Sequence, residues 1–599
     1  MTGKSRRARI IATALCVLMA DVVAMSQVAV PTITLTPGEL FFRLDGTPSL
    51  LLGTNPTGWM TSQWDTLLGY AGVNERIVRI HITNGKAPHP TEAGQVDEPW
   101  AIFWDGVFTT AEQNGLLVLP VIDGWADWSE TNPGTQTWAN NIYNAANPIC
   151  TDGIHVCGTA ASPVELLQDT PTRALWLGYL RTLVNRWKGR PNILGWEVFS
   201  EISLITGATE ADGVLFVEAA AAVIRAEDTS GRPVTASLAG VIDWPTLATS
   251  SIDFIQIHPY ATATGGNLDE LILDTVRDRR TLYPDKPIFI GESGLDSRAP
   301  VTFNTLVLDP EAPVGINQAI WAAAVSGAMN GRMLWFEDGY DQFHFLADGV
   351  TRLNLHDGYA NASAPVAAFL QGVDYSGFAP ITLVTSADIT GATLGNDDLV
   401  LGWVKDGQSV APDWPARLLT GQTATVFATG VSHDWLVTFY DTDTGAEVQS
   451  EYANQAADGS ISITLPDFDG SIAFQIRAVP PIDVVIDIIP GGSRNRINPN
   501  IKGRFRVAIL TTHTADGEPI DFEASSVAPA TVLFGPGGAL ALANALVDVD
   551  GDGDLDLGLA FRKRDTGLVC GDTVASLTGE TLDGRAIAGS DVVTIVGCP

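Results

Sequence analysis

The sequence predicts an α/β fold, a (β/α)8 TIM barrel, followed by two small all-β domains, and three observations carry this prediction. From about residue 31 to residue 374, short apolar runs alternate with amphipathic helical patterns. Most of these runs are continuously apolar, which is typical of parallel strands buried on both faces. After residue 376 the runs alternate between polar and apolar residues, as antiparallel strands with one buried face do.

Eight strands are expected in the first region, at residues 50–53, 77–82, 116–122, 193–198, 234–237, 254–257, 287–290 and 333–336. Helical patterns lie between them, for example at residues 171–188, 213–227, 268–282 and 314–329. Eight strand–helix units in about 340 residues fit a barrel with loop insertions. A doubly wound open sheet is the competing fold, but no glycine-rich phosphate loop follows the first strand.

Four segments are predicted along the chain. Residues 1–29 form a signal peptide, residues 30–375 the barrel, residues 376–480 a β-sandwich and residues 481–599 a β-rich module. The alternating run at 460–465 and a hairpin signal at 441–445 indicate the sandwich. Pro480 and Pro481 mark the linker to the last module.

The N-terminus predicts export. Four basic residues between positions 4 and 9 precede an apolar run at 10–20 and small residues up to about Ala29, the order of a signal peptide. The alternative is an uncleaved membrane anchor, although the apolar run is short for a bilayer. We therefore expect a secreted protein that has no membrane contact after cleavage and is a monomer.

Composition and cysteine placement narrow the function classes. With 34 basic and 69 acidic residues the net charge is −35, which would repel a phosphate backbone, so nucleic acid is excluded as a partner.

Outside the leader, Cys150 and Cys157 are close in sequence, as are Cys570 and Cys598, and neither pair has zinc-site spacing. Two local disulfides are expected, with unpaired buried thiols as the alternative.

Two glutamates follow predicted strands, where the chemistry of a barrel is found. Glu201 is the second-last residue of the segment 192–202, and Glu292 is the third-last residue of the segment 286–294. Two such carboxyl groups can supply the proton donor and the nucleophile or base that glycosidic cleavage needs. The alternative is that each is a solvated or salt-bridged loop residue.

Polar and aromatic residues at other strand ends accompany the two glutamates. Arg79 can keep a neighbouring carboxylate ionised, and His81 follows on the same face of that strand. A Tyr260 phenol can hydrogen-bond a nucleophilic glutamate. Trp335 can stack on a sugar ring, although core packing is the commoner role of a single tryptophan. The remaining residues of this kind are Asn55, Trp59, Asp123, Trp125, Trp128 and His258.

At these residues the chain resembles clan A glycoside hydrolases, especially the family-five cellulase and mannanase type, over about residues 35–375. Similar enzymes read W-E-x-x-N-E and P-x-x-x-G-E-x-G, which the resemblance places on Glu201 as acid/base and Glu292 as nucleophile. It also places the family's strand-end residues on Arg79, His258, Tyr260 and Trp335. The family's Asn before the acid/base, which contacts the sugar 2-hydroxyl, is Ser200 here, and this departure concerns the identity of the substrate.

The long loop at 122–170 is predicted to form one wall of the substrate cleft, because it carries several tryptophans, Trp125 among them, and the first cysteine pair. A structural Ω-loop is the alternative.

An aspartate run in the last module suggests a structural Ca²⁺ site. Asp548, Asp550, Asp552, Asp554 and Asp556 stand at positions 1, 3, 5, 7 and 9 of a calcium-type loop. The bidentate Glu of position 12 is replaced by Leu559, so the loop is not a complete EF-hand, and an acidic surface turn is the alternative. The segment around 482–500 resembles an accessory module at the C-termini of secreted bacterial proteins.

The sequence therefore predicts a secreted retaining glycoside hydrolase that cleaves β-linked polysaccharide or oligosaccharide and needs no catalytic cofactor. The alternative is a non-catalytic carbohydrate-binding or adhesive protein built on such a barrel. An esterase or peptidase has no support, because neither a GxSxG elbow nor an HExxH pair is present.

Overall fold

The computed structural model describes residues 32–598, except residues 37, 57–63, 83–91, 133–136, 152–153, 241, 263–266, 297–311, 336–343, 346–351, 354–362, 411–413, 429–433, 457 and 493. The predicted signal peptide, Trp59 and Phe336 lie outside the described residues. Within the described part of the chain, no helix is both long and apolar enough to cross a bilayer.

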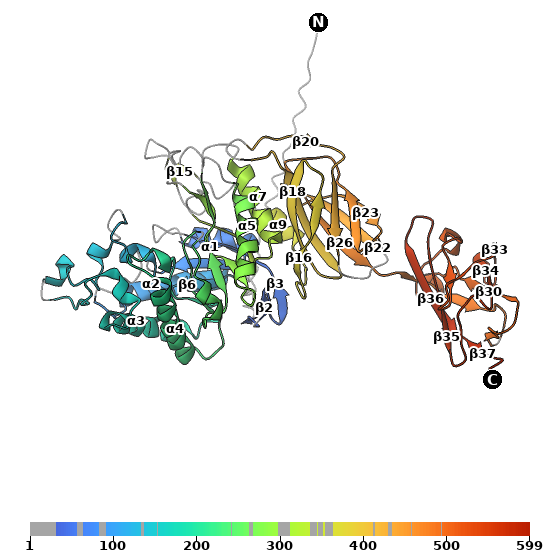
Figure 1. Cartoon of the computed structure of the whole chain (residues 1–599), viewed down its shortest axis with the longest axis horizontal. Coiled ribbons are helices and arrows are strands. Elements are labelled where there is room, and N and C mark those ends of the chain that lie inside the picture. Colours follow the sequence, from blue (N-terminus) through green and yellow to red (C-terminus); the bar gives the residue numbers. More distant parts are fainter. Residues whose placement is uncertain are drawn as a thin grey trace, which may run out of the picture.

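The first region is built on parallel strands, as predicted. Six of them form one sheet in the order β13-β4-β5-β6-β7-β8, seen behind the helices in Figure 1. Their bounds are β4 (Leu51–Thr54), β5 (Ile77–His81), β6 (Leu117–Val121), β7 (Trp196–Glu197), β8 (Val234–Thr235) and β13 (Asn330–Leu334). Nearly every residue in them is buried, which explains why their sequences are mostly apolar.

The two remaining predicted strands, β9 (Ile255–Ile257) and β11 (Ile288–Ile290), form a parallel pair. The bridge Ser237↔Gln256 joins this pair to the β8 side of the sheet, and Ser293↔Leu334 joins it to the β13 side. The eight strands are thus connected in a ring, which gives the region a barrel-like form. A second parallel pair, β10 (Tyr260–Thr262) and β12 (Gly294–Asp296), continues the chain beyond the carboxyl ends of β9 and β11.

Helices follow the strands and cover the sheet. They are α1 (Trp64–Asn74), α2 (Glu98–Gln113), α3 (Pro171–Trp187), α4 (Glu210–Glu227), α5 (Leu268–Leu282), α7 (Ala312–Val325) and α9 (Ser363–Phe369). Helix α4 starts three residues before its predicted position because Thr209 caps it, its side chain accepting from the Asp212 N–H. Helix α3 has Pro171 in its first turn and Thr170 as cap, which fixes its start.

A small three-stranded sheet precedes the barrel strands. It contains β1 (Ile33–Thr34), β2 (Phe42–Leu44) and β3 (Thr47–Ser49). Phe42 packs edge-on against Phe254 and Phe289, at 5.7 and 6.3 Å between ring centroids. Phe254 directly precedes β9 and Phe289 is the middle residue of β11, so this sheet packs against these two barrel strands. A short hairpin of β14 (His344–Phe345) and β15 (Arg352–Leu353) lies after β13.

Antiparallel β-structure follows, as predicted. One sheet contains β16 (Ala379–Ile381), β18 (Ile389–Gly395), β19 (Leu399–Asp406), β26 (Ser471–Val479), β22 (Asp434–Asp441) and β23 (Glu447–Ala453) in that order. Across a shared apolar core lie β17 (Leu383–Thr385), β21 (Thr423–Phe427) and β24 (Ser460–Thr464), with the pair β20 (Leu418–Leu419) and β25 (Phe468–Asp469) beside them. The hairpin signal at 441–445 is confirmed, because it joins β22 to β23.

This sandwich packs directly on the barrel helices α5, α7 and α9, as Figure 1 shows. Leu401 and Trp403 of β19 belong to the same apolar core as the barrel. The Trp321 indole of α7 donates to the Thr442 carbonyl at 3.0 Å. The contact between the two parts is therefore an extension of the barrel core.

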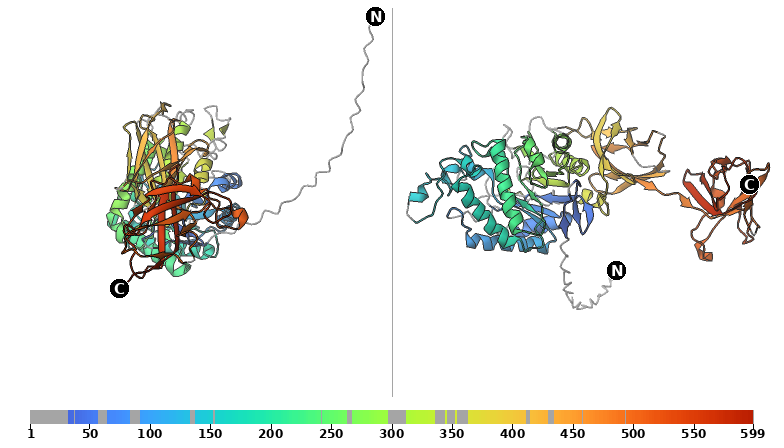
Figure 2. Two further views of the ribbon diagram at one scale, coloured as in Figure 1. Left: turned by 90° about the vertical axis from the view of Figure 1, so that its right-hand side faces the viewer. Right: turned by 60° about the horizontal axis from the view of Figure 1, so that its bottom comes forward.

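The last region has an apolar core of its own and lies apart at the far end of the long axis (Figures 1 and 2). One sheet has the order β27 (Ile482–Asp483), β36 (Ala586–Val592), β35 (Val574–Glu580), β31 (Leu533–Phe534), β32 (Ala539–Leu540). The other has β28 (Ile486–Ile488), β30 (Arg504–Ile509), β34 (Asp556–Arg562), β33 (Ala543–Val547), and a third pair joins β29 (Arg496–Ile497) to β37 (Thr594–Ile595).

Both predicted disulfides are confirmed. Cys150 is bonded to Cys157 and Cys570 to Cys598, with Cα–Cα distances of 5.7 and 5.8 Å. Disulfides form and persist in oxidising compartments, so these bonds indicate an extracytoplasmic environment.

Candidate active site

The two predicted glutamates lie together at the carboxyl ends of the strands. Glu201 follows β7 and Glu292 follows β11. One carboxylate oxygen of each lies within 4.8 Å of the other. His258 stands beside both, with its Nδ1 2.9 Å from Glu201 Oε1 and 3.5 Å from Glu292 Oε2. Residues 91 positions apart in sequence thus meet in one site, because parallel strands end at the same edge of the barrel.

Glu292 is buried and held from several sides. Its Oε1 accepts from Arg79 Nη1 at 2.7 Å, and its Oε2 accepts from the Tyr260 hydroxyl at 2.7 Å. His81 Nε2 lies 3.5 Å from Oε1. Burial alone would raise the pKa of Glu292, but the charges of His258 and Arg79 outweigh it and hold this pKa well below its usual range. Glu292 is therefore a carboxylate at neutral pH.

Glu201 lies in a different environment. Its side chain is about twice as exposed as that of Glu292, at 13% against 7%. Its backbone is in the left-handed region, with φ 54° and ψ 46°, which costs a non-glycine residue roughly 1 kcal/mol or more. The Ser237 hydroxyl accepts from the Glu201 N–H at 2.9 Å and holds this turn. The turn directs the side chain toward His258.

Arg79 is the centre of the site and has a partner that the sequence analysis missed. Its Nε and Nη2 donate to the two oxygens of Glu197, both at 2.6 Å, and neither side chain is exposed. Burial would raise the pKa of Glu197, but the charge and hydrogen bonds of Arg79 lower it. A signal was present in the sequence: a charged residue inside a continuously apolar strand requires a charged partner, and Glu197 and Arg79 are two such residues.

The side chains of Asn55 and Ser200 accept hydrogen bonds from Arg79 and do not point out of the site. Asn55 Oδ1 accepts from Arg79 Nη1 at 3.1 Å, and its Nδ2 donates to the Gly291 carbonyl at 3.0 Å. Ser200 Oγ accepts from Arg79 Nη2 at 3.0 Å, and the residue is 2% exposed. Ser200 was expected to stand where a sugar 2-hydroxyl binds, but its oxygen is turned toward Arg79.

His81 and Trp335 form a contact at the edge of the site. Their rings meet edge to face with centroids 5.0 Å apart. Burial and the charge of Arg79 lower the pKa of His81, so its imidazole is neutral at neutral pH. Trp335 is 7% exposed and follows β13, whose register shifts between Gly331 and Leu334 and whose Arg332 and Met333 have positive φ. This bulge re-aims the strand end that carries Trp335.

The predicted cleft wall is mostly a packed structural loop. Trp128 and Trp138 are buried, with ring centroids 5.6 Å apart, and the Trp128 indole donates to Asp123 at 3.1 Å. Trp125, which is partly buried, lies beside the candidate site, because its backbone N–H donates to the Ser200 carbonyl at 3.2 Å. Trp128 and Trp138 therefore belong to the core, as in the Ω-loop alternative.

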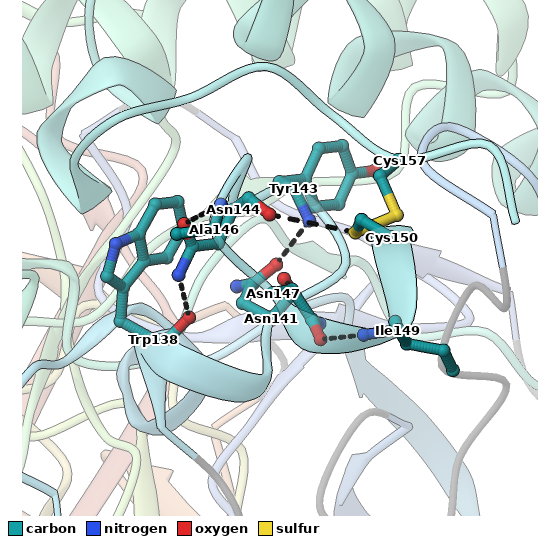
Figure 3. The surroundings of a disulfide bond; sticks show 9 residues. All are labelled: Trp138, Asn141, Tyr143, Asn144, Ala146, Asn147, Ile149, Cys150 and Cys157. Carbon is teal, nitrogen blue, oxygen red and sulfur yellow. Dashed lines mark hydrogen bonds between the residues drawn. A yellow bond between two sulfur atoms is a disulfide. The ribbon is translucent and has the colours of Figure 1, made fainter. Parts of the chain in front are cut away.

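A repeat of asparagines organises the loop beside the first disulfide (Figure 3). The side-chain oxygens of Asn141, Asn144 and Asn147 each accept from the N–H two residues later, at 2.9, 2.9 and 3.1 Å. Their amide groups donate to carbonyls of the preceding loop, for example Asn144 to Trp138 at 2.9 Å. Such Asx turns satisfy the backbone of a segment that has no regular structure.

Two groups among the described residues bring three acidic or histidine side chains within 4.8 Å of one another. The first is Glu201, His258 and Glu292. A metal ion does not fit there, because the guanidinium of Arg79 already contacts Glu292 and would repel a second cation.

The second group contains three of the five predicted calcium ligands, Asp548, Asp550 and Asp552. The other two are engaged elsewhere. Asp554 pairs with His513 at 3.1 Å, and the buried Asp556 accepts from the Thr511 and Val549 N–H groups at 2.9 and 2.8 Å. The predicted five-residue set is thus reduced to three, and Ca²⁺ binding there stays a prediction.

Comparison with known proteins adds evidence on the fold. No family model and no curated protein matches the sequence. Among solved structures, one titled glycoside hydrolase matches with a TM-score of 0.51 and 13% identity, over 75% of this chain and 97% of that one. Two GH30 xylanases, from Clostridium papyrosolvens and Clostridium acetobutylicum, match with TM-scores of 0.40 and 0.42, each at 12% identity over 72% of this chain and 97% of theirs. The first match shows that the barrel-like fold is shared with a solved glycoside hydrolase, whereas membership of family five stays a prediction.

Proposed function

We propose that the protein is a secreted retaining glycoside hydrolase that cleaves β-linked polysaccharide or oligosaccharide. The observation that carries the proposal is the pair Glu201 and Glu292, which lie in two different environments with one carboxylate oxygen of each within 4.8 Å of the other. Retaining enzymes hold their two carboxyl groups about 5 to 5.5 Å apart, whereas inverting enzymes leave about 6.5 to 9.5 Å for a water molecule. The short separation favours double displacement.

Glu292 is assigned the role of nucleophile. Its low pKa keeps it ionised, and Arg79 and Tyr260 orient its oxygens by hydrogen bonds of 2.7 Å each. The carboxylate attacks the anomeric carbon and forms a glycosyl–enzyme ester as the glycosidic bond breaks. As the ester forms, the bonding oxygen of Glu292 loses negative charge, and the hydrogen bond that it accepts from Arg79 or Tyr260 weakens.

Glu201 is assigned the role of acid/base. It protonates the leaving-group oxygen in the first step and takes a proton from the attacking water in the second. His258, 2.9 Å from its Oε1, orients the carboxyl group in both steps. Its greater exposure suits a group that exchanges a proton with water twice in each cycle.

Binding of the sugar is assigned to the residues around this pair. Trp335 and Trp125 offer aromatic faces, and His81, His258 and Tyr260 offer polar groups at the strand ends. The two disulfides support secretion. A separate apolar cluster supports a module at 481–599. The cluster between the sandwich sheets supports a sandwich at 376–480 beside a (β/α)8 barrel at 30–375, whose own cluster extends to Leu401 and Trp403.

The test is product analysis with the full-length protein on glucan, mannan and galactan panels and on aryl β-glycosides. We expect release of reducing sugar, with the β-anomer as the first product in a proton NMR time course, and loss of this activity in Glu292→Gln. An α-anomer first would overturn the retaining assignment. Binding to a polysaccharide without turnover of any substrate would favour the non-catalytic alternative.

A further inference from the structure

We infer that Glu197 is a positioning residue that links the two candidate catalytic glutamates, through Arg79 to Glu292 and through Ser237 to Glu201. The inference rests on the proposed function, because it concerns how that site is held. Glu197 lies on β7 four residues before Glu201, with its side chain fully buried. Its side chain hydrogen-bonds Arg79 and Ser237, so its geometric effect on the two candidate carboxylates passes through these two partners.

The link to Glu292 is geometric. A guanidinium is planar and its five N–H groups point in fixed directions. Glu197 takes the Nε–H and one Nη2–H in a bidentate pair, with both distances 2.6 Å, which fixes the plane of Arg79. With that plane fixed, Nη1 faces Glu292 and donates to it at 2.7 Å. The second N–H of Nη2 donates to the Ser200 hydroxyl oxygen.

The link to Glu201 runs through one hydroxyl. Ser237 Oγ donates to Glu197 Oε1 at 3.0 Å. The same oxygen accepts from the Glu201 N–H at 2.9 Å. The carboxylate of Glu197 orients the hydroxyl proton toward itself, so a lone pair of Oγ faces the Glu201 N–H. That contact holds Glu201 in its left-handed turn.

The link to Glu292 also has an electrostatic part. Arg79 forms ion pairs with two carboxylates at once, those of Glu197 and Glu292, so its positive charge stabilises both. The other groups that face Glu292 are His81 from β5, His258 from the end of β9, Tyr260 from β10 and Glu201 from the end of β7. If Glu197 were neutral, Arg79 would bind Glu292 more strongly, which would lower the pKa of Glu292 and weaken it as a nucleophile.

The competing view is that Glu197 only balances a buried charge and stabilises the barrel. The two views differ in the pH profile. Loss of a purely structural ion pair lowers stability and activity at every pH, whereas loss of a charge coupled to the nucleophile moves the acidic limb of kcat/KM. In Glu197→Gln we expect that limb to shift downward by roughly one pH unit, because the remaining charge of Arg79 acts on Glu292 alone.

The experiment uses the full-length protein and the aryl β-glycoside that the wild type hydrolyses fastest. Glu197→Gln should reduce kcat by roughly 10- to 100-fold through misplacement of Arg79, with the downward shift of the acidic limb. The matched control is Glu75→Gln, which removes a carboxylate from another buried ion pair, to Arg332 at 3.0 Å. Glu75 lies at the amino end of β5, whereas the candidate site lies at the carboxyl ends of the strands. This control should lose stability and keep the wild-type pH profile.

A second variant covers the case in which Glu197→Gln does not fold. Ser237→Ala breaks only the link to Glu201, so it should reduce turnover of phenyl glycosides, which need protonation, far more than turnover of dinitrophenyl glycosides, which need little. An acidic limb that is unchanged or moves upward in Glu197→Gln, or equal losses on both leaving groups in Ser237→Ala, would overturn the inference. A wild type that hydrolyses no glycoside would instead overturn the proposed function.

Discussion

Lys405 of the sandwich strand β19 forms an ion pair with Asp269 of the barrel helix α5, with Nζ and Oδ2 2.6 Å apart and neither side chain appreciably exposed. Glu270 lies 3.2 Å from the same nitrogen. A lysine that is fully buried needs such partners, because an isolated buried charge is strongly unfavourable. The sandwich is therefore fixed to the barrel by charge as well as by apolar packing.

Removing Lys405 is expected to destabilise the barrel and sandwich together. Lys405→Met leaves Asp269 buried without its cation, and breaking a buried pair from one side costs about 3 to 5 kcal/mol. We expect one cooperative unfolding transition for both parts, shifted to lower urea concentration. The exposed Lys502, changed to Met as a control, should leave the transition in place. Separate transitions for barrel and sandwich would contradict this view of the interface.

The two candidate catalytic residues are expected to respond differently to removal. Glu292→Ala should lose activity on every substrate, because no glycosyl–enzyme can form. Glu201→Ala should retain turnover of aryl glycosides with good leaving groups and lose roughly 10²- to 10⁴-fold on poor ones, the usual contribution of a general acid.

Added azide distinguishes the two variants further. The anion can replace the attacking water when the base is missing, so azide should raise the rate of Glu201→Ala and produce a β-glycosyl azide detectable by mass spectrometry. Glu292→Ala should not respond in this way. A β-glycosyl azide formed by Glu292→Ala and not by Glu201→Ala would reverse the two assigned roles, whereas an α-glycosyl azide from Glu292→Ala is the inverted product expected when azide replaces a missing nucleophile.

The fold and the meeting of Glu201 with Glu292 could be predicted because each left a local pattern. The eight strands are mostly apolar, and Glu201 and Glu292 follow two of them within four residues. Glu197 was missed because its meaning depends on Arg79, 118 residues away in sequence, and on the register that places β7 near β5. The burial of Trp128 and Trp138 was missed for a related reason. A tryptophan in a loop gives no local sign of whether it packs inward, and here the buried acceptor Asp123 and the asparagine turns decide that it does.

Stability is expected to fall as the pH rises from about 4 to about 7, because of two aspartates near the start of the long loop. Burial raises the pKa of Asp127 to about 7, and burial together with the charge of Asp127 raises the pKa of Asp123 to about 6. A carboxyl group whose pKa is higher in the folded state stabilises the protein below its unfolded pKa, near 3.9, and loses this contribution as the pH rises through the folded value.

The variant Asp127→Asn tests this pH dependence. It should be more stable than the wild type at pH 8, by about 1 to 3 kcal/mol, and should match it more closely at pH 4. Urea unfolding at several pH values measures the difference. Asp285→Asn, a change at an exposed position, is the control and should follow the wild-type curve. A difference between Asp127→Asn and wild type that does not change with pH would contradict the prediction.

Chelation is expected to destabilise the last module without affecting the candidate active site. Asp548, Asp550 and Asp552 hold their oxygens within 4.8 Å of one another, and burial and the charges of Asp556 and Asp552 raise the pKa of Asp550. A bound Ca²⁺ would offset this repulsion and stabilise the folded state by about 2.7 kcal/mol at a hundredfold excess over Kd.

Because this module has its own core, calorimetry of the full-length protein should show EDTA lowering one transition and leaving the barrel transition and glycosidase activity in place. Asp548→Asn should remove the response to EDTA, and Asp565→Asn, outside the cluster, should keep it. A wild-type profile that EDTA leaves unchanged would show that the aspartate run is an acidic surface turn.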